Sequence, residues 1–512
     1  GELARRGAAV PGRHLALALT ALARLKYQRT EVLGALACAA GEAAAAGRLP
    51  PRDMAHAVWA LGRLRAEAPE LYAAAGRRVV ADPAAFSPAS LARIALGLSN
   101  AQAEAPGALW AVARDAAARA GEYGPVALAQ VAWAASRGGE LGALAALAEP
   151  AAAAVGGMAP PDVVRLAVAF ARAGEGHEGL WAAVCAALLR PGALRALPPS
   201  QLAQVGWALA AAGHYDAALV EALAAVALPC VAGADPQDLP RLLLALAQLR
   251  HGADRLLAEV ARAWGRRLDA FSPQGLSLLA YACVMLQAGG PAGSALLPGV
   301  AAQLVAHHAE FSPSELALTA WSLAAGGALS KQAVDALAPG LPALELNRID
   351  MCQLYQAHLA GQQRLLLDGE LLAECAEAAG PGPPLSDAAV EVSDVLLGLG
   401  VPAQLGSRSP DGMVPVGLEA PLPPPLGPVA VEVDGPSRFL RNASATPTGA
   451  AALWRRLLLG SGFRAVVTVP SQAWEALPDE PSKQLLLRDL FARQAGIDID
   501  ADLNAAAAEE AE

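Results

Sequence analysis

Apolar residues recur along most of the chain in blocks separated by short polar or glycine-containing breaks. Most blocks open with a proline and run for about 13 apolar-rich residues. A second amphipathic run follows, such as the one at 256–267. Proline suits the first turn of a helix, because the amide hydrogen that it lacks has no partner there. The blocks therefore predict helices, two in every unit.

The units themselves repeat at a regular spacing. Ten can be counted, with steps of 34 to 40 residues and a mean near 37. Their anchors are Pro51, Pro88, Pro125, Pro160, Pro199, Pro236, Pro273 and Pro313, with divergent units at Gly12 and Asn347. One helical pair cannot bury such an apolar face alone, so neighbouring pairs must stack. The sequence predicts a mainly α-helical chain with an α-solenoid over residues 1–380.

Positions within a unit separate into faces. Counted from the proline, position +3 is aliphatic, position +8 is large and apolar, and position +9 is small. We interpret +3 and +8 as core positions, and +9 as the place where neighbouring helices approach closely. The +8 series is Trp59, Leu96, Trp133, Val168, Trp207, Leu244, Tyr281 and Trp321.

Positions +5 and +12 break the apolar rule. At about 100° per residue they lie within about 20° of each other, on one edge of the buried stripe. They are polar in the first units, except at Ala211, and become apolar later, at Leu278, Met285, Leu318 and Ala325. We call the polar side chains the ladder: His56, Arg63, Arg93, Asn100, Gln130, Arg137, Arg165, Arg172, Gln204, Arg241 and Gln248.

The ladder carries side chains that suit base edges and phosphates, and helical-repeat readers present such groups one unit per nucleotide. Charge follows it: residues 1–267 hold 26 Lys and Arg against 21 Asp and Glu, and residues 268–380 hold 3 against 10. The net charge of −10 argues against binding by bulk charge alone. We therefore expect RNA on the ladder. The alternative is an ordinary solvated edge, since Arg outnumbers Lys 35 to 3 throughout.

The repeat pattern stops near residue 380, and Pro-Gly-Pro-Pro at 381–384 marks a boundary. An α/β pattern follows, with predicted helices at 386–400, 448–460 and 481–494 and predicted strands at 413–418, 429–435 and 463–469. We expect a linker and the start of the α/β domain at 381–428, its core at 429–496, and a disordered acidic tail at 497–512.

Specific motifs stand in this segment. Residues 431–440 read VEVDGPSRFL, and after them come Thr448-Gly449, Arg455-Arg456, Gly462-Phe463-Arg464, Val469-Pro470 and Trp474. This pattern resembles the RAP domain. The proline-anchored units resemble octotricopeptide repeats, and together the two resemblances cover nearly the whole chain. They imply a green-algal RNA-binding factor of the chloroplast or mitochondrion that acts in RNA maturation, stability, splicing or translation.

The RAP resemblance also implies a restriction-endonuclease-like fold, in which carboxylates on adjacent strands hold a divalent metal for phosphodiester cleavage. Glu432 and Asp434 alternate along one strand, so they point the same way and are the catalytic candidates. Gly417, Arg438 and Trp454 replace other polar residues of the family pattern. We therefore favour a domain without nuclease activity and without cofactor, in which both carboxylates hydrogen-bond the turn at 435–436. Mg²⁺ is expected only for a nuclease.

Three hypotheses follow. The first is a sequence-selective single-stranded RNA-binding factor, in which the ladder reads bases and Arg438, Arg455 and Arg456 contact phosphates. The second is a structural subunit or assembly factor of an organellar, mitochondrial ribosome that binds rRNA, with protein partners on the acidic units at 269–379. The third is a metal-dependent RNA endonuclease. We expect no metal site among the dispersed histidines and no membrane segment. Residue 1 is Gly, so we expect any targeting peptide to lie upstream.

Overall fold

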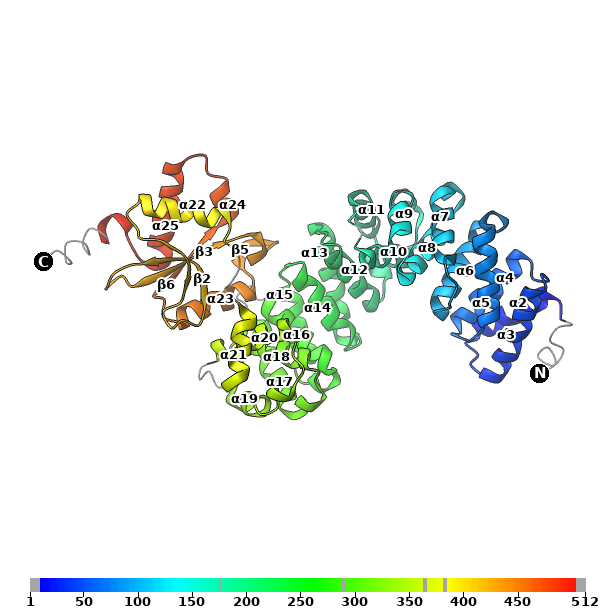
Figure 1. Cartoon of the computed structure of the whole chain (residues 1–512), viewed down its shortest axis with the longest axis horizontal. Coiled ribbons are helices and arrows are strands. Elements are labelled where there is room, and N and C mark those ends of the chain that lie inside the picture. Colours follow the sequence, from blue (N-terminus) through cyan, green and yellow to red (C-terminus); the bar gives the residue numbers. More distant parts are fainter. Residues whose placement is uncertain (1–9, 175, 287–290, 362–365, 381–384, 503–512) are drawn as a thin grey trace. The chain divides into compact units, whose positions relative to one another are not determined.

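The computed structural model describes residues 10–502, except 175, 287–290, 362–365 and 381–384. It is mainly helical, with a helical-repeat solenoid followed by a small sheet-containing domain (Figure 1). The chain divides into two compact units, Gly1–Val226 and Ala227–Glu512. The second unit therefore holds the last repeats together with the α/β domain, whereas we expected a division near 380. The expected boundary at 381–384 lies outside the described residues.

Helices in the first unit pair as the repeat predicts. The first helices of successive pairs pack against one another, and the second helices form a parallel row. The first helices are α2 (Gly12–Arg24), α4 (Pro51–Arg63), α6 (Pro88–Ala101), α8 (Pro125–Gly138), α10 (Pro160–Ala173) and α12 (Pro199–Ala211). The second helices are α3 (Thr30–Ala45), α5 (Pro69–Ala81), α7 (Ala108–Ala118), α9 (Leu141–Ala154), α11 (Glu178–Leu188) and α13 (Ala217–Ala227). No helix within the described residues is both long and apolar enough to cross a membrane.

The first helices approach closely where the unit carries small residues. A Cβ atom added to Gly97 of α6 would lie 2.5 Å from the carbonyl oxygen of Val58 in α4. One added to Gly62 of α4 would lie 2.1 Å from the carbonyl oxygen of Gly97. Both distances are far below van der Waals contact, so the backbones themselves touch. Gly97 occupies position +9, and the predicted close approach at this position is confirmed for this helix pair.

Most first helices begin at the predicted proline. Before α6, the Ser87 hydroxyl accepts a hydrogen bond from the Ser90 amide, which satisfies one of the free amides of the first turn. The unit anchored at Pro236 differs, because α14 begins at Asp238. Pro236 lies in a turn instead, where Asp235 Oδ1 accepts a hydrogen bond from the Gln237 amide. The side-chain bond of Asp235 thus delays the helix by two residues.

The second unit begins with further helical pairs of the same kind. Its first helices are α14 (Asp238–Gln248), α16 (Pro273–Met285), α18 (Pro313–Ala325) and α20 (Arg348–Ala360). Its second helices are α15 (Asp254–Trp264), α17 (Pro291–His307), α19 (Lys331–Leu337) and α21 (Gly369–Ala379).

A small α/β domain completes the second unit. Its main sheet has the strand order β1-β2-β3-β6, in which β1, β2 and β3 are antiparallel and β6 is parallel to β3. The strands are β1 (Gln404–Arg408), β2 (Pro415–Pro421), β3 (Pro428–Asp434), β4 (Phe439–Leu440), β5 (Ala443–Pro447) and β6 (Ala465–Pro470). The helices are α22 (Asp387–Gly398), α23 (Gly449–Gly460), α24 (Ser471–Glu475) and α25 (Glu480–Ala495).

The core of this domain joins the sheet to α22, α24 and α25. Its largest fully buried side chains are Trp474 and Phe491, which pack with valines of β3 and β6. Ile497 and Ile499 are also buried in it, with 0% and 2% of their surface exposed. The packed domain thus extends past 496, and the prediction of a disordered tail from 497 is wrong for these residues. Residues 503–512 lie outside the described part of the chain.

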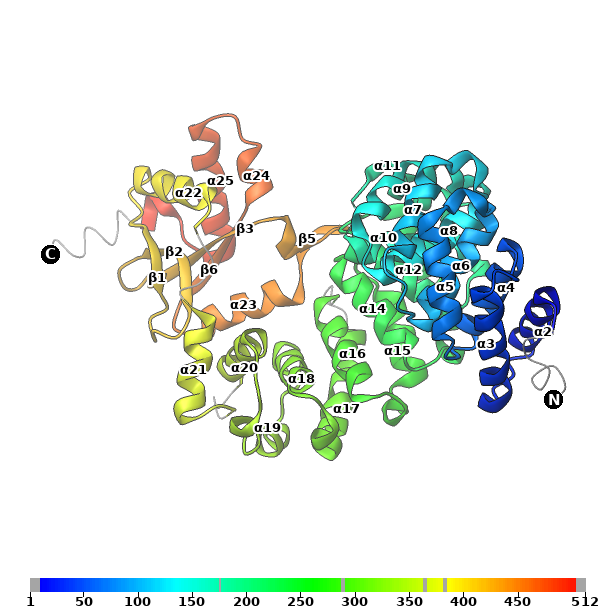
Figure 2. The same ribbon diagram turned by 45° about the vertical axis from the view of Figure 1, so that its right-hand side comes forward.

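Helix α23 packs against the first helices α16, α18 and α20 of its own unit (Figure 2). At its start, a Cβ atom on Gly449 would lie 2.1 Å from the carbonyl oxygen of Val284 in α16. Further along, Arg456 Nη2 donates hydrogen bonds to the carbonyl oxygens of Ala324 (2.7 Å) and Ala325 (3.0 Å), at the end of α18. These contacts lie at or beside positions +12 of α16 and α18, where the ladder has become apolar.

The β4–β5 hairpin makes a second contact between the α/β domain and the helical repeats of the same unit. The amide of Arg441 donates a hydrogen bond to the carbonyl oxygen of Arg250, at 2.7 Å. The Asn442 side chain pairs with the backbone of Gly252 in both directions, at 2.8 and 2.9 Å. The Arg250 guanidinium donates to the carbonyl oxygen of Pro436. The α/β domain is therefore anchored to the solenoid of its own unit from the end of α14 to α20.

Candidate nucleic-acid interface

The ladder lies on the accessible surface of the first helices. In the first unit its residues lie on α4, α6, α8, α10 and α12, and each is exposed or half-exposed. Arg241 and Gln248 are exposed on α14 of the second unit. None of the ladder residues is buried, so all present their polar groups at the surface. Their contact with RNA stays a prediction.

Ladder side chains on neighbouring first helices contact each other. Arg93 Nη1 of α6 lies 3.3 Å from His56 Nε2 of α4, across one repeat. Burial, and after it the positive charge of Arg93, lowers the pKa of His56. The imidazole is therefore neutral at pH 7, so its Nε2 can accept a hydrogen bond from the guanidinium. On α10, Arg165 Nη1 is held by Asp162 Oδ1 at 2.6 Å.

Tryptophans share this face. Trp59 of α4 and Trp133 of α8 are half-exposed, and Trp207 of α12 is 37% exposed. The interpretation of position +8 as uniformly core is wrong in these units. It lies only about 40° to 60° around the helix from positions +12 and +5, so its side chain borders the ladder. Trp, Leu and Val alternate along the series, which places an accessible indole on every second first helix.

Ladder arginines lie against these indoles. The Arg63 guanidinium is 5.6 Å from the ring centroid of Trp59 on its own helix, and that of Arg172 is 6.0 Å from Trp133 one unit earlier. Such cation–π contacts hold two flat groups beside each other. The face combines planar hydrogen-bond donors with accessible aromatic rings, and these are the two components that single-stranded nucleic-acid grooves use for backbone contact and base stacking.

A similar pair occurs on the opposite row of helices. Trp110 of α7 is 44% exposed, and the Arg114 guanidinium lies 5.1 Å from its ring centroid. Helix α7 is a second helix, so this pair is not part of the ladder. One exposed tryptophan beside an arginine therefore does not define the interface. What distinguishes the candidate interface is that tryptophans and arginines recur together along the first helices.

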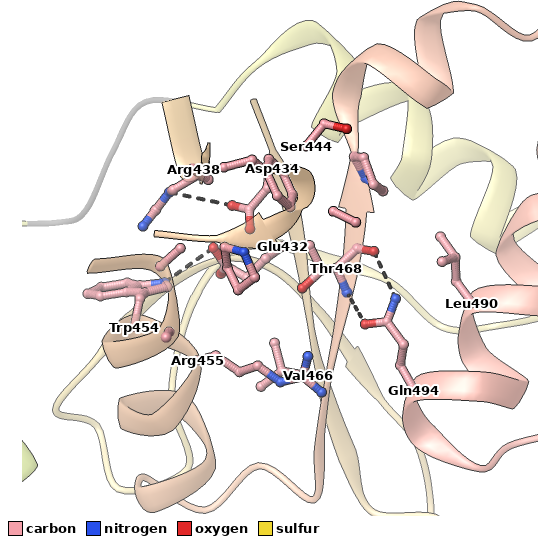
Figure 3. A pocket seen from close by; sticks show the side chains of 16 residues that line it. Glu432, Asp434, Arg438, Ser444, Trp454, Arg455, Val466, Thr468, Leu490 and Gln494 are labelled. Atoms are coloured by element: carbon pink, nitrogen blue, oxygen red, sulfur yellow. Dashed lines mark hydrogen bonds and ion pairs between the residues drawn. The ribbon is translucent and has the colours of Figure 1, made fainter. Parts of the chain in front are cut away.

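The second candidate site is a pocket of about 330 Å³ in the α/β domain (Figure 3). Glu432 and Asp434 of β3 both line it, as their alternation along the strand predicts. Helix α23 contributes Trp454 and Arg455, and Arg438 comes from the short turn after β3. Strands β4, β5 and β6 and helix α25 supply the rest of its lining.

Both carboxylates have raised pKa values. Glu432 Oε2 accepts a hydrogen bond from Trp454 Nε1 at 3.2 Å. Burial, and after it the negative charge of Asp434, raises the pKa of Glu432 to about 7. Burial also raises the pKa of Asp434, although Arg438, whose Nε lies 3.4 Å from Asp434 Oδ1, acts in the opposite direction. Both side chains line the pocket, which corrects the expectation that they bond the turn at 435–436.

The donor set does not fit a nuclease metal centre. Among the residues that the structure describes, no three His, Cys, Asp or Glu side chains are grouped to hold a metal ion. One oxygen of each of the two carboxylates that are present is engaged, Glu432 Oε2 by an indole and Asp434 Oδ1 by a guanidinium, and burial raises the pKa of both groups, which favours their neutral form. A hard cation such as Mg²⁺ needs ionised carboxylate oxygens that are free to coordinate it.

The three arginines of the α/β domain that were predicted to contact phosphates lie in two different environments. Arg438 and Arg455 line the pocket. Arg456 instead binds the carbonyl oxygens at the end of α18, and burial lowers its pKa. Arg456 therefore holds α23 on the solenoid, because a cation is favoured at a helix C-terminus, and its contact with RNA stays a prediction.

Sequence reasoning missed several pocket residues. The side chain of Gln494, on α25, bonds both the amide and the carbonyl oxygen of Thr468 on β6, at 2.9 and 3.1 Å. Both residues line the pocket far from Glu432 in sequence, so only the fold brings them there. Trp454 did carry a signal, since it stands where the family pattern has a basic residue.

No family model matches the chain, and no curated protein matches its sequence. Among solved structures, the chain is similar to the pentatricopeptide repeat protein PPR10 from maize. The two are 14% identical over 78% of each chain, with a TM-score of 0.21. At that TM-score the likeness carries no argument about function.

Proposed function

We propose that this protein binds single-stranded RNA on the ladder face of α4, α6, α8, α10 and α12. One observation carries the proposal: accessible tryptophans at position +8 lie on the same face as the ladder, on every second first helix (α4, α8 and α12). Indoles can stack on unpaired bases, while the guanidinium, amide and imidazole groups beside them bond base edges and phosphates.

The alternating indoles favour a single strand over a duplex. In a duplex the base faces are covered by their neighbours, and its A-form grooves offer mainly phosphates and 2′-hydroxyls. A surface for duplex RNA would need basic residues but no accessible aromatic rings. Selectivity among single-stranded sequences comes from the change of side chain at positions +5 and +12, such as Gln130 and Arg137 on α8 against Arg165 and Arg172 on α10.

The resemblances to two RNA-binding families support a more specific cellular role for this RNA binding. Octotricopeptide repeats followed by a RAP-like domain support a role in an organelle, in RNA maturation, stability, splicing or translation. A ribosomal role on rRNA would use the same face. Sequencing of RNA crosslinked to the protein separates the two, since a maturation factor yields a short footprint in one transcript and a ribosomal subunit yields a structured rRNA site.

The test compares two double variants with equal charge change. Arg165→Ala with Arg172→Ala removes two ladder arginines from α10. The control, Arg77→Ala with Arg114→Ala, removes two exposed arginines from the second helices α5 and α7. With a pool of single-stranded RNAs randomised over about 20 positions, we expect the ladder variant to lose affinity at least about tenfold and the control to change little.

Two outcomes would contradict the proposal. Equal losses in both variants would mean that RNA is held by overall charge. Undiminished affinity in the ladder variant would mean that the ladder is a solvated edge. Circular dichroism of both variants confirms that the helices are retained, which is expected because all four side chains are at least partly exposed.

A further inference from the structure

The pocket of the α/β domain is large enough to admit a flat ring. Its volume of about 330 Å³ exceeds that of a nucleobase and leaves room for the attached sugar. Much of its lining is apolar or aromatic, from Phe439, Pro447, Ala451, Trp454, Pro470 and Leu490. Such walls favour a planar heteroaromatic group, while the few polar side chains fix which edge of the ring can enter.

Two of those polar side chains, Glu432 and Asp434 of β3, present carboxylate oxygens, beside donors such as Arg438 and Arg455. Glu432 Oε2 accepts the Trp454 indole hydrogen, and Asp434 Oδ1 faces Arg438. The second oxygen of each carboxylate is left as an acceptor for a ligand. Because the two residues are spaced by one along β3, both oxygens project from the same side of the strand. The ligand must therefore offer two neighbouring hydrogen-bond donors.

Guanine meets this requirement among the four RNA bases. Its Watson–Crick edge carries the N1 and N2 donors side by side, with the O6 acceptor next to them. Uracil has one donor between two carbonyl oxygens, and cytosine and adenine place an acceptor next to their amino group. A carboxylate facing any of those acceptors would be repelled.

We propose that this pocket binds the guanine base of a nucleotide, with Glu432 and Asp434 accepting its N1 and N2 hydrogens. Arg438 and Arg455 at the pocket provide the positive charge for the attached phosphate. The guanine belongs either to a free mononucleotide or to an unpaired position in bound RNA. The site is separate from the ladder and does not require it.

Calorimetric titration of the full chain with GMP, AMP, CMP and UMP tests the site. At pH 8, where Glu432 is ionised, we expect GMP to bind about tenfold more tightly than the other three. Glu432→Gln replaces an acceptor oxygen by an amide donor that faces guanine N–H, so we expect the preference for GMP to be lost. The control is Glu419→Gln on β2, which lies outside the pocket and should leave GMP binding unchanged.

Equal affinities for GMP and UMP in the unchanged protein would overturn the proposal, as would full GMP binding by Glu432→Gln. The first outcome needs no variant, so it decides the matter even if Glu432→Gln does not fold. Asp434→Asn is a second variant with the same expected loss.

The source of the guanine is found with short RNAs. An oligonucleotide with one guanine among uracils is compared with an all-uracil oligonucleotide. If the guanine comes from RNA, the guanine-containing oligonucleotide binds at least about tenfold more tightly than GMP, and GMP displaces it. If the source is a free nucleotide, GMP binds and displaces neither oligonucleotide. The ladder variant Arg165→Ala with Arg172→Ala should keep its GMP affinity, so failure of the ladder and failure of the pocket can be told apart.

Discussion

The same repeat positions carry opposite chemistry on α8 and α10 of the first unit and on α16 and α18 of the second. On α8 and α10, positions +5 and +12 are glutamine and arginine, and all four side chains are exposed or half-exposed. On α16 and α18, these positions are Leu278, Met285, Leu318 and Ala325. Beside the +12 positions of both helices, α23 of the α/β domain supplies the neighbour.

The difference shows what the repeat determines and what it leaves open. The helical pair determines which repeat positions face the ladder side of the first helices. Whether the residues at these positions are polar or apolar depends on whether solvent or another part of the chain lies against them. Position +8 shows the same effect, because Trp133 is half-exposed on α8 whereas Trp321 of α18 is 6% exposed and donates its indole hydrogen to Gln356 Oε1 at 2.8 Å. On α16, α18 and α20 part of this surface is covered by the α/β domain of the same chain, and a separate protein partner of the acidic units stays a prediction.

The largest effect is expected where α23 meets α16. Gly449→Ala places a Cβ atom 2.1 Å from the Val284 carbonyl oxygen, so α23 must move away from the solenoid. We expect the free energy of unfolding to fall by about 3 kcal/mol, in the upper range for an overpacked contact. Urea or thermal unfolding measures this loss.

Gly460→Ala, at the other end of α23, is the matched control. Its Cβ atom would meet nothing within 4 Å, so stability should stay within about 0.5 kcal/mol of the unchanged protein. Equal stability of the two variants would show that α23 does not dock on α16 and that the apolar ladder positions need another explanation.

A smaller effect is expected from the buried carboxylate, which contrasts with the exposed charges of the ladder. Because the pKa of Glu432 is raised to about 7 in the folded protein, the folded state binds more protons than the unfolded state between pH 4.5 and 7. Stability should therefore fall by roughly 1 to 3 kcal/mol as the pH rises through this window. Unfolding at pH 5 and pH 8 measures it.

Glu432→Gln removes the titrating group, so the variant should lose most of this pH dependence. Asp434 also has a raised pKa and Arg438 opposes both shifts, so a small slope is expected to remain. A pH dependence that is identical in the two proteins would contradict the burial of an ionisable Glu432 in the pocket.

Much of the architecture could be predicted from the sequence. The spacing of the prolines located the first helices, and the alternation of Glu432 and Asp434 correctly placed both on one side of β3. The polar strand β1 and the short β4–β5 hairpin carry no apolar alternation, so they were missed. The burial of Ile497 and Ile499 was missed because two isoleucines among acidic residues do not outweigh the local composition.

The sites depended more strongly on tertiary contacts. Position +8 was misjudged because a tryptophan at the border of a buried stripe gives the same sequence pattern whether it is covered or not. Arg456 was expected at RNA because sequence shows a charged pair, Arg455-Arg456, but not the carbonyl groups that lie opposite one of them. The pocket needs strands and helices that are far apart in sequence, and only the sheet order brings these together.

The central claim is that the first-helix face, rather than exposed aromatic and basic surface in general, binds RNA. The Trp59–Arg63 pair on α4 and the Trp110–Arg114 pair on α7 have the same spacing and similar cation–π contacts, on opposite rows of helices. The most direct measurement compares the affinity of Trp59→Ala and Trp110→Ala for the same single-stranded RNA pool. We expect a loss of about tenfold for Trp59→Ala and less than about twofold for Trp110→Ala. Equal affinities for the two variants, or a larger loss for Trp110→Ala, would contradict it.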